Sequence, residues 1–498
     1  MNKFKPATHE RLSQFPCEIS VLIYGTSSRL IEFAEALDCN DSYKVAGFIS
    51  DDPMVAGTKI QGLPVYDKNK IEEPILKPNT SQAILIDPKD IDRGEKQQIF
   101  EFCLRNDMEL LTIPDWSDRK EVAGMKLRKI QIEDLLGRIP IAIDTESIGK
   151  NLKDKVVMVT GAAGSIGSEI VRQLCHFDAR MLILCDIAES PLFDLSVELD
   201  EKFPETPYTS KLCNVQDYNQ MKCIIEKYKP DYIYHAAAYK HVPLMENHPC
   251  EAVLTNVLGS KNIIDLAVAN EVEVFVMVST DKAVNPTNVM GATKRIAEIY
   301  VQSLYKKLKN EQETPPRIIT TRFGNVLGSS GSVIPLFTKQ IENGGPITVT
   351  HEDIIRYFMT IREACRLVLE AGNMGKGGEV FLFDMGDSVR IVDLAEKMIR
   401  LSGLEPYKDI DIVFTGLRPG EKLYEELLYD KEKVQVTHNR KILIGTVREY
   451  DFDVVSREIG ELIHIAYTYN KFELVKKMKQ IVPEFISQNS IYSMIDEG

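Results

Sequence analysis

The chain has 498 residues, more than one hydrophobic core accommodates, so two or three domains are expected. Hydrophobic residues make up 44% and charged residues 27%, which is typical of a folded globular protein and excludes a disordered chain. The formal net charge of −14 repels polyanions, which disfavours nucleic-acid binding and requires local cations around any anionic ligand.

Targeting segments and metal motifs are not evident in the sequence. No apolar run approaches the roughly 20 residues that span a bilayer, and the first 16 residues lack the apolar core of a signal peptide. The nine cysteines are scattered without a C-x-x-C pair, as expected of reduced thiols, and the eight histidines form no metal-ligand spacing. We therefore expect a cytoplasmic protein that has no metal site and does not insert into a membrane.

The first α/β unit begins at Ile19, where an apolar run ends at Gly25 and gives way to helical spacing. Further apolar runs as far as residue 114 are predicted strands. We predict a Rossmann-like domain in residues 1–115. The proline and glycine residues that follow predict a linker in 116–150.

The glycine loop of this first domain lacks the later glycines that a phosphate needs. After Gly25, the positions that follow include Ser27, Ser28 and Leu30, whose side chains would meet an approaching phosphate. We interpret the domain as a degenerate nucleotide fold kept for packing or oligomerisation. A nucleotide bound in this domain is the alternative.

A second strand–glycine–helix unit begins at Lys155, and apolar runs alternate with helical segments as far as about residue 320. This alternation predicts an α/β fold with a doubly wound, parallel Rossmann-like sheet. We expect the second domain to cover residues 151–498. Its sheet should lie in about 151–320, and a smaller lobe for a substrate should lie mostly in 320–498.

The motif T-G-A-A-G-S-I-G at 160–167 follows the first strand of the second domain and opens a helix. Glycines at these places let the backbone turn tightly and approach a pyrophosphate at the helix N-terminus. Their G-x-x-G-x-x-G spacing is typical of short-chain dehydrogenase/reductase-like enzymes. Asp186 ends the next strand, 19 residues after Gly167, close to the roughly 20 expected for the acid that binds an adenosine ribose. No Arg or Lys follows it directly, which favours NAD over NADP.

Another strand of this domain ends in Thr280, Asp281 and Lys282, and a helix begins near Met290. The carboxyl edge of an open parallel sheet is where ligands and catalytic groups gather. Short-chain dehydrogenases carry Y-x-x-x-K at the start of this helix, and here Met290 replaces the tyrosine while Lys294 remains. A thioether cannot serve as the general base, so ordinary alcohol oxidation by the usual tyrosine is excluded at this position.

The residues predicted to bind the cofactor come from the glycine loop, the next two strand ends, the alanines after His235 and the helix lysine. They are Gly161, Gly164, Ser165, Ile166, Gly167, Asp186, Asn214, Val215, Ala236, Ala237 and Lys294. Asn214 and Val215 would flank the adenine. His235 itself is interpreted as a packed strand residue.

The sequence resembles a known family, the nucleotide-sugar 4,6-dehydratases of polysaccharide and glycan biosynthesis. It looks like the large branch that acts on UDP-N-acetylglucosamine. The resemblance spans about residues 18–445. It is carried by the glycine motif, H-A-A-A-Y-K-H-V-P-L-M-E (235–246), S-T-D-K-A-V-N-P-T-N-V-M-G-A-T-K-R (279–295), R-F-G-N-V-L-G-S-S-G-S-V-I-P (322–335) and L-R-P-G-E-K-L-Y-E-E-L (417–427). The linker segment R-K-I-Q-I-E-D-L-L-G-R (128–138) also matches the large branch. Large-branch members usually carry several N-terminal transmembrane helices, and their absence here is a departure from the pattern.

The resemblance implies an extended short-chain dehydrogenase/reductase fold and a reaction in which NAD oxidises C4 of the sugar, water leaves across C5–C6 and the hydride returns to C6. It assigns Lys282 as the C5 base, Asp281 as the acid at C6 and Thr280 as a hydrogen-bonding partner of the C4 oxygen. A lysine base needs a pKa below its usual value of about 10.4, which burial or the neighbouring Lys294 would provide. The group that takes the C4 proton stays open, with Asp281, acting through Thr280 or a water, as the hypothesis.

The resemblance also implies a UDP-N-acetylhexosamine as the substrate and predicts its binding residues. Arg356 and Arg418 would grip the diphosphate through planar guanidinium forks, Asn325 would contact phosphate and Glu421 would accept from the uridine ribose. The loop with Lys240 and His241 would border the sugar, and Met290 would shape the pocket. A homo-oligomer is expected.

Two other functions stay open. A 4-epimerase rotates a 4-keto intermediate and needs the tyrosine that Met290 replaces. The second alternative is a cofactor-binding sensor that has lost catalysis. The adjacent acid and amine of Asp281 and Lys282 argue against this alternative. Two details also stay open. The first is whether the reaction retains or inverts C5, and the second is whether the sugar is N-acetylglucosamine or its C4 epimer.

Overall fold

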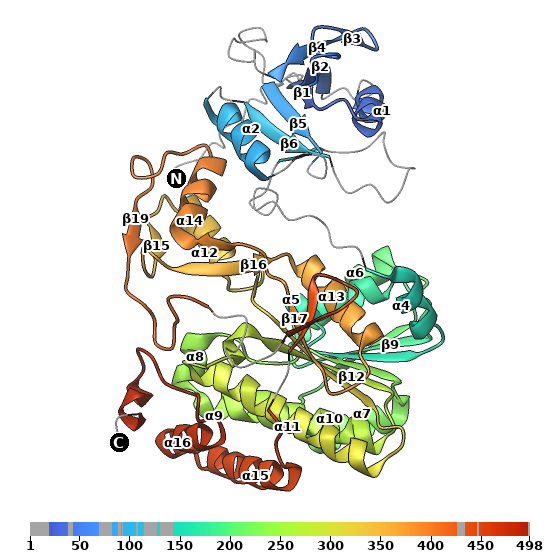
Figure 1. Cartoon of the computed structure of the whole chain (residues 1–498), viewed down its shortest axis with the longest axis vertical. Helices are drawn as coiled ribbons and strands as arrows, with labels where there is room; N and C mark the ends of the chain where they lie inside the picture. Colours follow the sequence, from blue (N-terminus) through green and yellow to red (C-terminus); the bar gives the residue numbers. More distant parts are fainter. Residues whose placement is uncertain are drawn as a thin grey trace, which may run out of the picture. The chain divides into compact units, whose positions relative to one another are not determined.

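The computed structural model describes residues 19–37, 43–68, 82–87, 91, 93–105, 108–113, 127–129, 143–425, 434–445 and 448–496. The chain divides into two compact units, Met1–Pro140 and Ile141–Gly498. Their elements are labelled in Figure 1. Part of the predicted linker and the end of the L-R-P-G-E-K-L-Y-E-E-L motif lie outside the described residues.

The first unit is a parallel sheet with helices. Its strands lie in the order β3-β4-β2-β1-β5-β6-β7, parallel from β4 to β6 and antiparallel at both edges. The elements are β1 (Ile19–Tyr24), α1 (Ser28–Leu37), β2 (Tyr43–Ser50), β3 (Lys59–Ile60), β4 (Leu63–Asp67), β5 (Gln82–Ile86), α2 (Arg93–Arg105), β6 (Glu109–Thr112) and β7 (Arg128–Lys129). The apolar runs read from the sequence are these strands, buried because both faces of a parallel sheet are covered.

The turn after β1 is closely packed at its glycine. Gly25 has a φ of +106°, and a methyl group built on it would lie 2.8 Å from Cδ1 of Leu30. Leu30 is itself buried in the core of this unit. The side chain that the sequence analysis expected to obstruct phosphate therefore packs directly against the turn.

The second unit holds a nine-stranded sheet in the order β10-β9-β8-β11-β12-β13-β17-β21-β20. The strands are β8 (Val156–Thr160), β9 (Met181–Asp186), β10 (Tyr208–Leu212), β11 (Tyr232–His235), β12 (Val274–Thr280), β13 (Arg317–Phe323), β17 (Val380–Phe383), β20 (Val434–Val436) and β21 (Ile442–Gly445). The strands from β10 to β17 are parallel, and β21 and β20 add in antiparallel fashion. The chain order reverses between β8 and β11, which opens a crevice at their carboxyl ends.

Helices cover both faces of this sheet, as Figure 1 shows. One face carries α7 (Tyr218–Tyr228), α10 (Ser260–Ala269) and α11 (Val289–Glu311), and the other carries α4 (Thr145–Leu152), α5 (Ser165–Leu174), α6 (Glu189–Lys202) and α13 (Ile361–Met374). Each face has its own buried apolar cluster. This is the predicted doubly wound architecture.

One helical run in the second unit is apolar and long enough to cross a membrane. It covers Pro249–Ala269 and joins α9 (Pro249–Ala252), a π-helical turn (Val253–Gly259) and α10. Of its 18-residue window, 72% is buried inside the unit, as in a core helix.

Beyond residue 320 the structure departs from the lobe that the sequence predicts, because β17, β20 and β21 extend the main sheet. The lobe itself contains two small sheets and two helices. They are β14 (Asn325–Val326), β16 (Ile355–Met359) and β18 (Ser388–Arg390), β15 (Ile347–Val349) and β19 (Ile412–Phe414), α12 (Val333–Glu342) and α14 (Ile391–Leu401). The second unit begins at Ile141, so α4 lies in it although the sequence analysis assigned these residues partly to the linker.

The last elements pack back onto the body of the second unit. Helices α15 (Phe452–Thr468) and α16 (Lys471–Ile481) share the buried cluster of α11. The segment after them runs along the loop that follows β12: the N–H of Ile486 donates to the carbonyl of Pro286 (3.1 Å) and the N–H of Gln488 to that of Thr287 (3.1 Å).

Candidate active site

The first strand of the main sheet leads into a glycine turn that only glycine fits. A methyl group on Gly161, whose φ is +67°, would lie 2.7 Å from the backbone of Ala237. A methyl group on Gly167 would lie 2.0 Å from the carbonyl oxygen of Gly161. Helix α5 then begins at Ser165 with no side chain capping its N-terminus. Its first N–H groups are the donors that an anionic pyrophosphate requires.

Asp186 is fixed at the carboxyl end of β9. Its carboxylate accepts from the N–H groups of Ala163 (2.8 Å) and Ala188 (2.9 Å), so it joins the glycine turn to the start of α6. A cavity beside it is lined by most of the predicted cofactor residues: Gly161, Gly164, Asp186, Asn214, Val215, Ala236 and Ala237. Ser165, Ile166, Gly167 and Lys294 are not among its lining residues. Tyr239 and Thr255, which sequence reasoning missed, also line it.

Lys294 and His235 are both buried. Burial lowers the pKa of Lys294 to about 8, and the structure gives its ammonium no hydrogen-bond partner among the residues described. His235 pairs with Thr160 Oγ1 (2.7 Å) and Ser260 Oγ (2.9 Å), and burial lowers its pKa to about 3. His235 is therefore a neutral, packed strand residue, as predicted.

The end of β12 brings together Thr280, Asp281 and Lys282. The Thr280 hydroxyl donates to Asp281 Oδ1 (2.9 Å), and Lys282 Nζ donates to the same oxygen (3.2 Å). The Asp281 side chain is 2% exposed, and its Oδ2 has no hydrogen-bond partner among the described residues. Burial and the negative charge of Glu425 raise its pKa to about 6. Asp281 therefore holds a proton more readily than an ordinary carboxyl group.

The expectation of a lowered pKa for Lys282 is wrong for the protein without substrate. Burial favours the neutral amine, but the carboxylates of Asp281 and Glu425 outweigh it, and the pKa of Lys282 is raised. The Lys282 ammonium lies 2.7 Å from Glu425 Oε1 and 3.1 Å from Asn325 Oδ1. Lys282 is thus held in its charged form.

Glu425 is the functional residue that the sequence analysis missed. Its side chain is 3% exposed, and Oε2 accepts from Nδ2 of Asn325 (2.7 Å) while Oε1 lies 3.3 Å from Nε of Arg356. Burial raises its pKa, but the attraction of Lys282 and Arg356 is stronger, so the pKa is lowered overall. Its motif was recognised, yet nothing local in L-Y-E-E-L separates a buried carboxylate from a solvated one.

Two packing features hold this segment in place. Ser279 donates to Oε1 of the buried Glu298 (2.6 Å). The same carboxylate accepts from Nε of Arg322 at Oε1 (2.9 Å) and from Nη2 of Arg322 at Oε2 (2.6 Å). Gly291, in the first turn of α11, lies against the backbone of Lys282: a methyl group there would be 2.1 Å from the Lys282 carbonyl oxygen. The segment at the end of β12 is therefore held by the buried Glu298 and by the first turn of α11.

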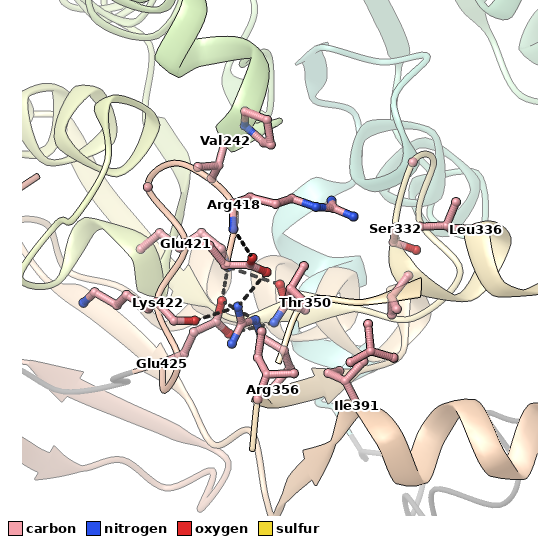
Figure 2. Close-up of a pocket in the computed structure, with 18 of the residues that line it drawn as sticks. Val242, Ser332, Leu336, Thr350, Arg356, Ile391, Arg418, Glu421, Lys422 and Glu425 are labelled. Atoms are coloured by element: carbon pink, nitrogen blue, oxygen red, sulfur yellow. Dashed lines mark hydrogen bonds and ion pairs between the residues drawn. The ribbon is translucent and has the colours of Figure 1, made fainter. Parts of the chain in front are cut away.

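A second cavity is lined by five of the predicted catalytic and substrate residues: Lys282, Asn325, Arg356, Arg418 and Glu421. Figure 2 shows the ionic cluster around Arg356, with Arg418 extending away from it across the cavity toward Ser332. The Arg356 guanidinium donates to the carbonyls of Ile355 (2.7 Å) and Lys422 (2.8 Å) and lies 3.3 Å from Glu421 Oε1.

Arg418 differs from Arg356 because its side chain is exposed and its guanidinium has no hydrogen-bond or ion-pair partner among the described residues. Only its backbone N–H is engaged, with Glu421 Oε2 at 3.0 Å. Of the two predicted phosphate-binding arginines, Arg418 is therefore the one whose guanidinium can bind a ligand directly. The guanidinium of Arg356 already bonds to the loop that contains Glu421 and Lys422.

Lys240, His241 and Met290 are not lining residues of the second cavity. Partial burial and the charge of Lys282 lower the pKa of Lys240. The His241 ring packs against Gly331, a residue that does line the cavity: a methyl group there would be 2.5 Å from His241 Cε1. Met290 is buried, 4% exposed, in the first turn of α11.

The loop after β14 joins the start of α5 to the second cavity. The N–H of Ser330 donates to Ser165 Oγ at the start of α5 (3.2 Å), and the adjacent Gly331 lines the second cavity. No cluster of three or more His, Cys, Asp or Glu able to hold a metal ion occurs in the described part of the chain.

Comparison with known proteins gives a consistent picture. Residues 157–447 match the family described as polysaccharide biosynthesis protein. The capsular polysaccharide biosynthesis protein CapD of Staphylococcus aureus is 45% identical over 421 residues, 84% of this chain and 68% of that protein. A UDP-glucose 4-epimerase of Rickettsia canadensis is 35% identical over 281 residues, 56% of this chain and 79% of that enzyme. The X-ray structure of Pen from Bacillus thuringiensis is 35% identical, covers 59% of this chain and 88% of its own, and has a TM-score of 0.54.

Proposed function

The chain belongs to the polysaccharide biosynthesis protein family, and on that premise we propose that it is a UDP-N-acetylglucosamine 4,6-dehydratase. The observation that carries the proposal is the buried Asp281 beside Lys282 at the end of β12, next to a helix that starts with Met290 in place of a tyrosine. An acid and an amine at this place suit elimination of water, which needs one group to give a proton and another to take one.

NAD is the cofactor that fits the first cavity. The turn at Gly161 and Gly167 leaves no space for side chains, the N-terminus of α5 offers free N–H groups, and Asp186 stands where an adenosine ribose would bind. NAD bound there would take up the hydride from C4 and return it at C6. Lys294, buried and without a hydrogen-bond partner among the described residues, would donate to the nicotinamide ribose.

The residues of the second unit would divide the proton transfers. Thr280 would hydrogen-bond the C4 oxygen, whose proton passes to Asp281 directly or through a water. Asp281, with a pKa near 6, would then give its proton to the C6 hydroxyl, which leaves as water. Lys282, as the neutral amine after its own proton has passed to solvent, would remove the C5 proton and would return a proton to C5 when the hydride adds at C6.

The diphosphate would lie in the second cavity. The exposed guanidinium of Arg418 is the first cation that it would meet, and Arg356 and Asn325 lie deeper. Glu421 would accept from the uridine ribose. Lys240 and His241 would border the sugar between the two cavities.

The test is to incubate the purified protein with UDP-N-acetylglucosamine, without added reductant, in deuterated water and to follow the product by mass spectrometry and proton NMR. We expect a 4-keto-6-deoxy sugar nucleotide that has lost one water and carries deuterium at C5. The same spectra report retention or inversion at C5. Recovery of unchanged sugar nucleotide from protein that has NAD bound would refute the proposal.

A 4-epimerase is the second candidate, favoured by the similarity to the Rickettsia enzyme. The same assay separates the two, because an epimerase keeps the C6 hydroxyl and inverts C4. Lys282→Ala provides a further distinction: it should stop water loss, whereas a non-catalytic sensor would keep its cellular function with this substitution.

A further inference from the structure

Three donors converge on the carboxylate of Glu425 inside the second cavity. Lys282 Nζ lies 2.7 Å from Oε1, and Nδ2 of Asn325 lies 2.7 Å from Oε2. Nε of Arg356 lies 3.3 Å from Oε1. Two cations and an amide around one nearly fully buried anion form an anion-binding site that the protein fills with its own side chain.

The pKa shifts agree with an anion held in this site. The pKa of Glu425 is lowered because Lys282 and Arg356 outweigh its burial, so its carboxylate stays charged. Two of the four cations that line the cavity are thereby neutralised before any ligand arrives. The exposed Arg418 remains as a first contact for an incoming anion.

We propose that the Glu425 carboxylate is an internal stand-in for a substrate phosphate, which displaces it from Arg356 and Asn325 when the nucleotide sugar binds. The inference rests on the proposed function, because it takes the ligand to be a diphosphate-linked sugar. A phosphate and a carboxylate make the same type of charge-assisted bonds to a guanidinium and an amide.

The displacement also frees Lys282. While Glu425 is in place, Lys282 is a charged ammonium between two carboxylates and has no lone pair to accept the C5 proton. Departure of Glu425 breaks its 2.7 Å contact with Lys282. Recognition of the diphosphate and release of the Lys282 side chain from this carboxylate are then one event.

The experiment is to measure binding of UDP and of inorganic pyrophosphate to the full-length protein by calorimetry, for the wild type, Glu425→Gln and Glu425→Ala. If the carboxylate competes with the ligand, both variants bind both probes more tightly, by about tenfold. If Glu425 merely supports the cavity, its removal loosens Lys282, Asn325 and Arg356 and weakens binding. The two roles therefore differ in the sign of the effect.

Glu405→Gln is the matched control. Glu405 pairs with Lys408 on the surface at 2.7 Å and does not line the cavity, so this change should leave UDP and pyrophosphate affinity unaltered. Unchanged or weaker binding of UDP and pyrophosphate in the Glu425 variants overturns the inference. If one of the two variants does not fold, the affinity of the other is sufficient for the test.

The binding measurement does not depend on turnover. The proposed dehydration and the proposed displacement of Glu425 can therefore be refuted independently of each other. Tighter binding in the variants together with no dehydration of UDP-N-acetylglucosamine would refute the proposed reaction and keep the displacement. Dehydration by the wild type together with unchanged binding in the variants would refute the displacement alone.

Discussion

Replacing Gly291 by alanine tests whether the contact between α11 and the catalytic segment sets the position of Lys282. The added methyl group would lie 2.1 Å from the Lys282 carbonyl oxygen and 3.0 Å from its carbonyl carbon. Real contacts of this kind begin above about 3 Å, so the two segments must separate by about 1 Å. Overpacking of this kind costs about 1–3 kcal/mol of unfolding free energy.

The effect on turnover should be larger than the effect on stability. A displacement of about 1 Å at a catalytic group costs on the order of 10²-fold in rate. We therefore expect Gly291→Ala to lower the dehydration rate about a hundredfold while the protein still folds, as measured by product formation and urea denaturation. The control is Gly460→Ala in α15, where a methyl group meets nothing within 4 Å and should stabilise the helix by about 0.5–1 kcal/mol. Wild-type turnover and stability in Gly291→Ala would refute the argument.

Three further predictions concern single side chains. Asp281→Asn should lower turnover by about 10²–10⁴-fold. Folding raises the pKa of Asp281 from 3.8 to about 6, so the wild type should lose stability relative to this variant as the pH rises from 3.8 to about 6. Denaturation at several pH values measures this loss. Glu298→Ala removes the carboxylate that pairs with the buried Arg322 at 2.6 Å and one of the two that pair with Arg295, and should cost about 3–5 kcal/mol in urea denaturation; a loss under 1 kcal/mol would contradict the buried network. Arg418→Ala should weaken UDP binding at least about tenfold by calorimetry while stability stays within about 0.5 kcal/mol, since its exposed guanidinium has no partner among the described residues; equal UDP affinity would remove it from the diphosphate site.

The fold of the second unit was predictable because its signals are local. The strand before Gly161, the glycine spacing and Asp186 at the next strand end follow one another within a single βαβ unit, and β8, α5 and β9 match them. The position of Asp281 and Lys282 at a strand end was predictable for the same reason. Local periodicity identifies each element, and the topology rules for parallel sheets place their carboxyl ends together.

The charge state of the site was not predictable. Lys282 and Glu425 are separated by 143 positions in the sequence, and their 2.7 Å contact depends on how the loop after Gly420 returns to the cavity. Sequence reasoning therefore assigned Lys282 a lowered pKa, although two carboxylates raise it. The same holds for Arg356, whose bond to the Lys422 carbonyl, 66 positions away, depends on tertiary packing and not on residue type.

The segment that follows α16 has a consequence for how the site forms during synthesis. The backbone bonds from Ile486 and Gln488 to the loop at Pro286 and Thr287 span about two hundred residues, and the N–H of Gly420 donates to the Gln488 carbonyl (2.7 Å). Contacts between such distant positions form late, since the intervening chain must first be ordered. The strands around the cofactor cavity can thus fold as they leave the ribosome, but the loop that follows the proposed catalytic residues stays without these partners until residue 488 has been made. The strands around the cofactor cavity would thus form before the loop after β12 reaches its final geometry, which requires residues 486–488.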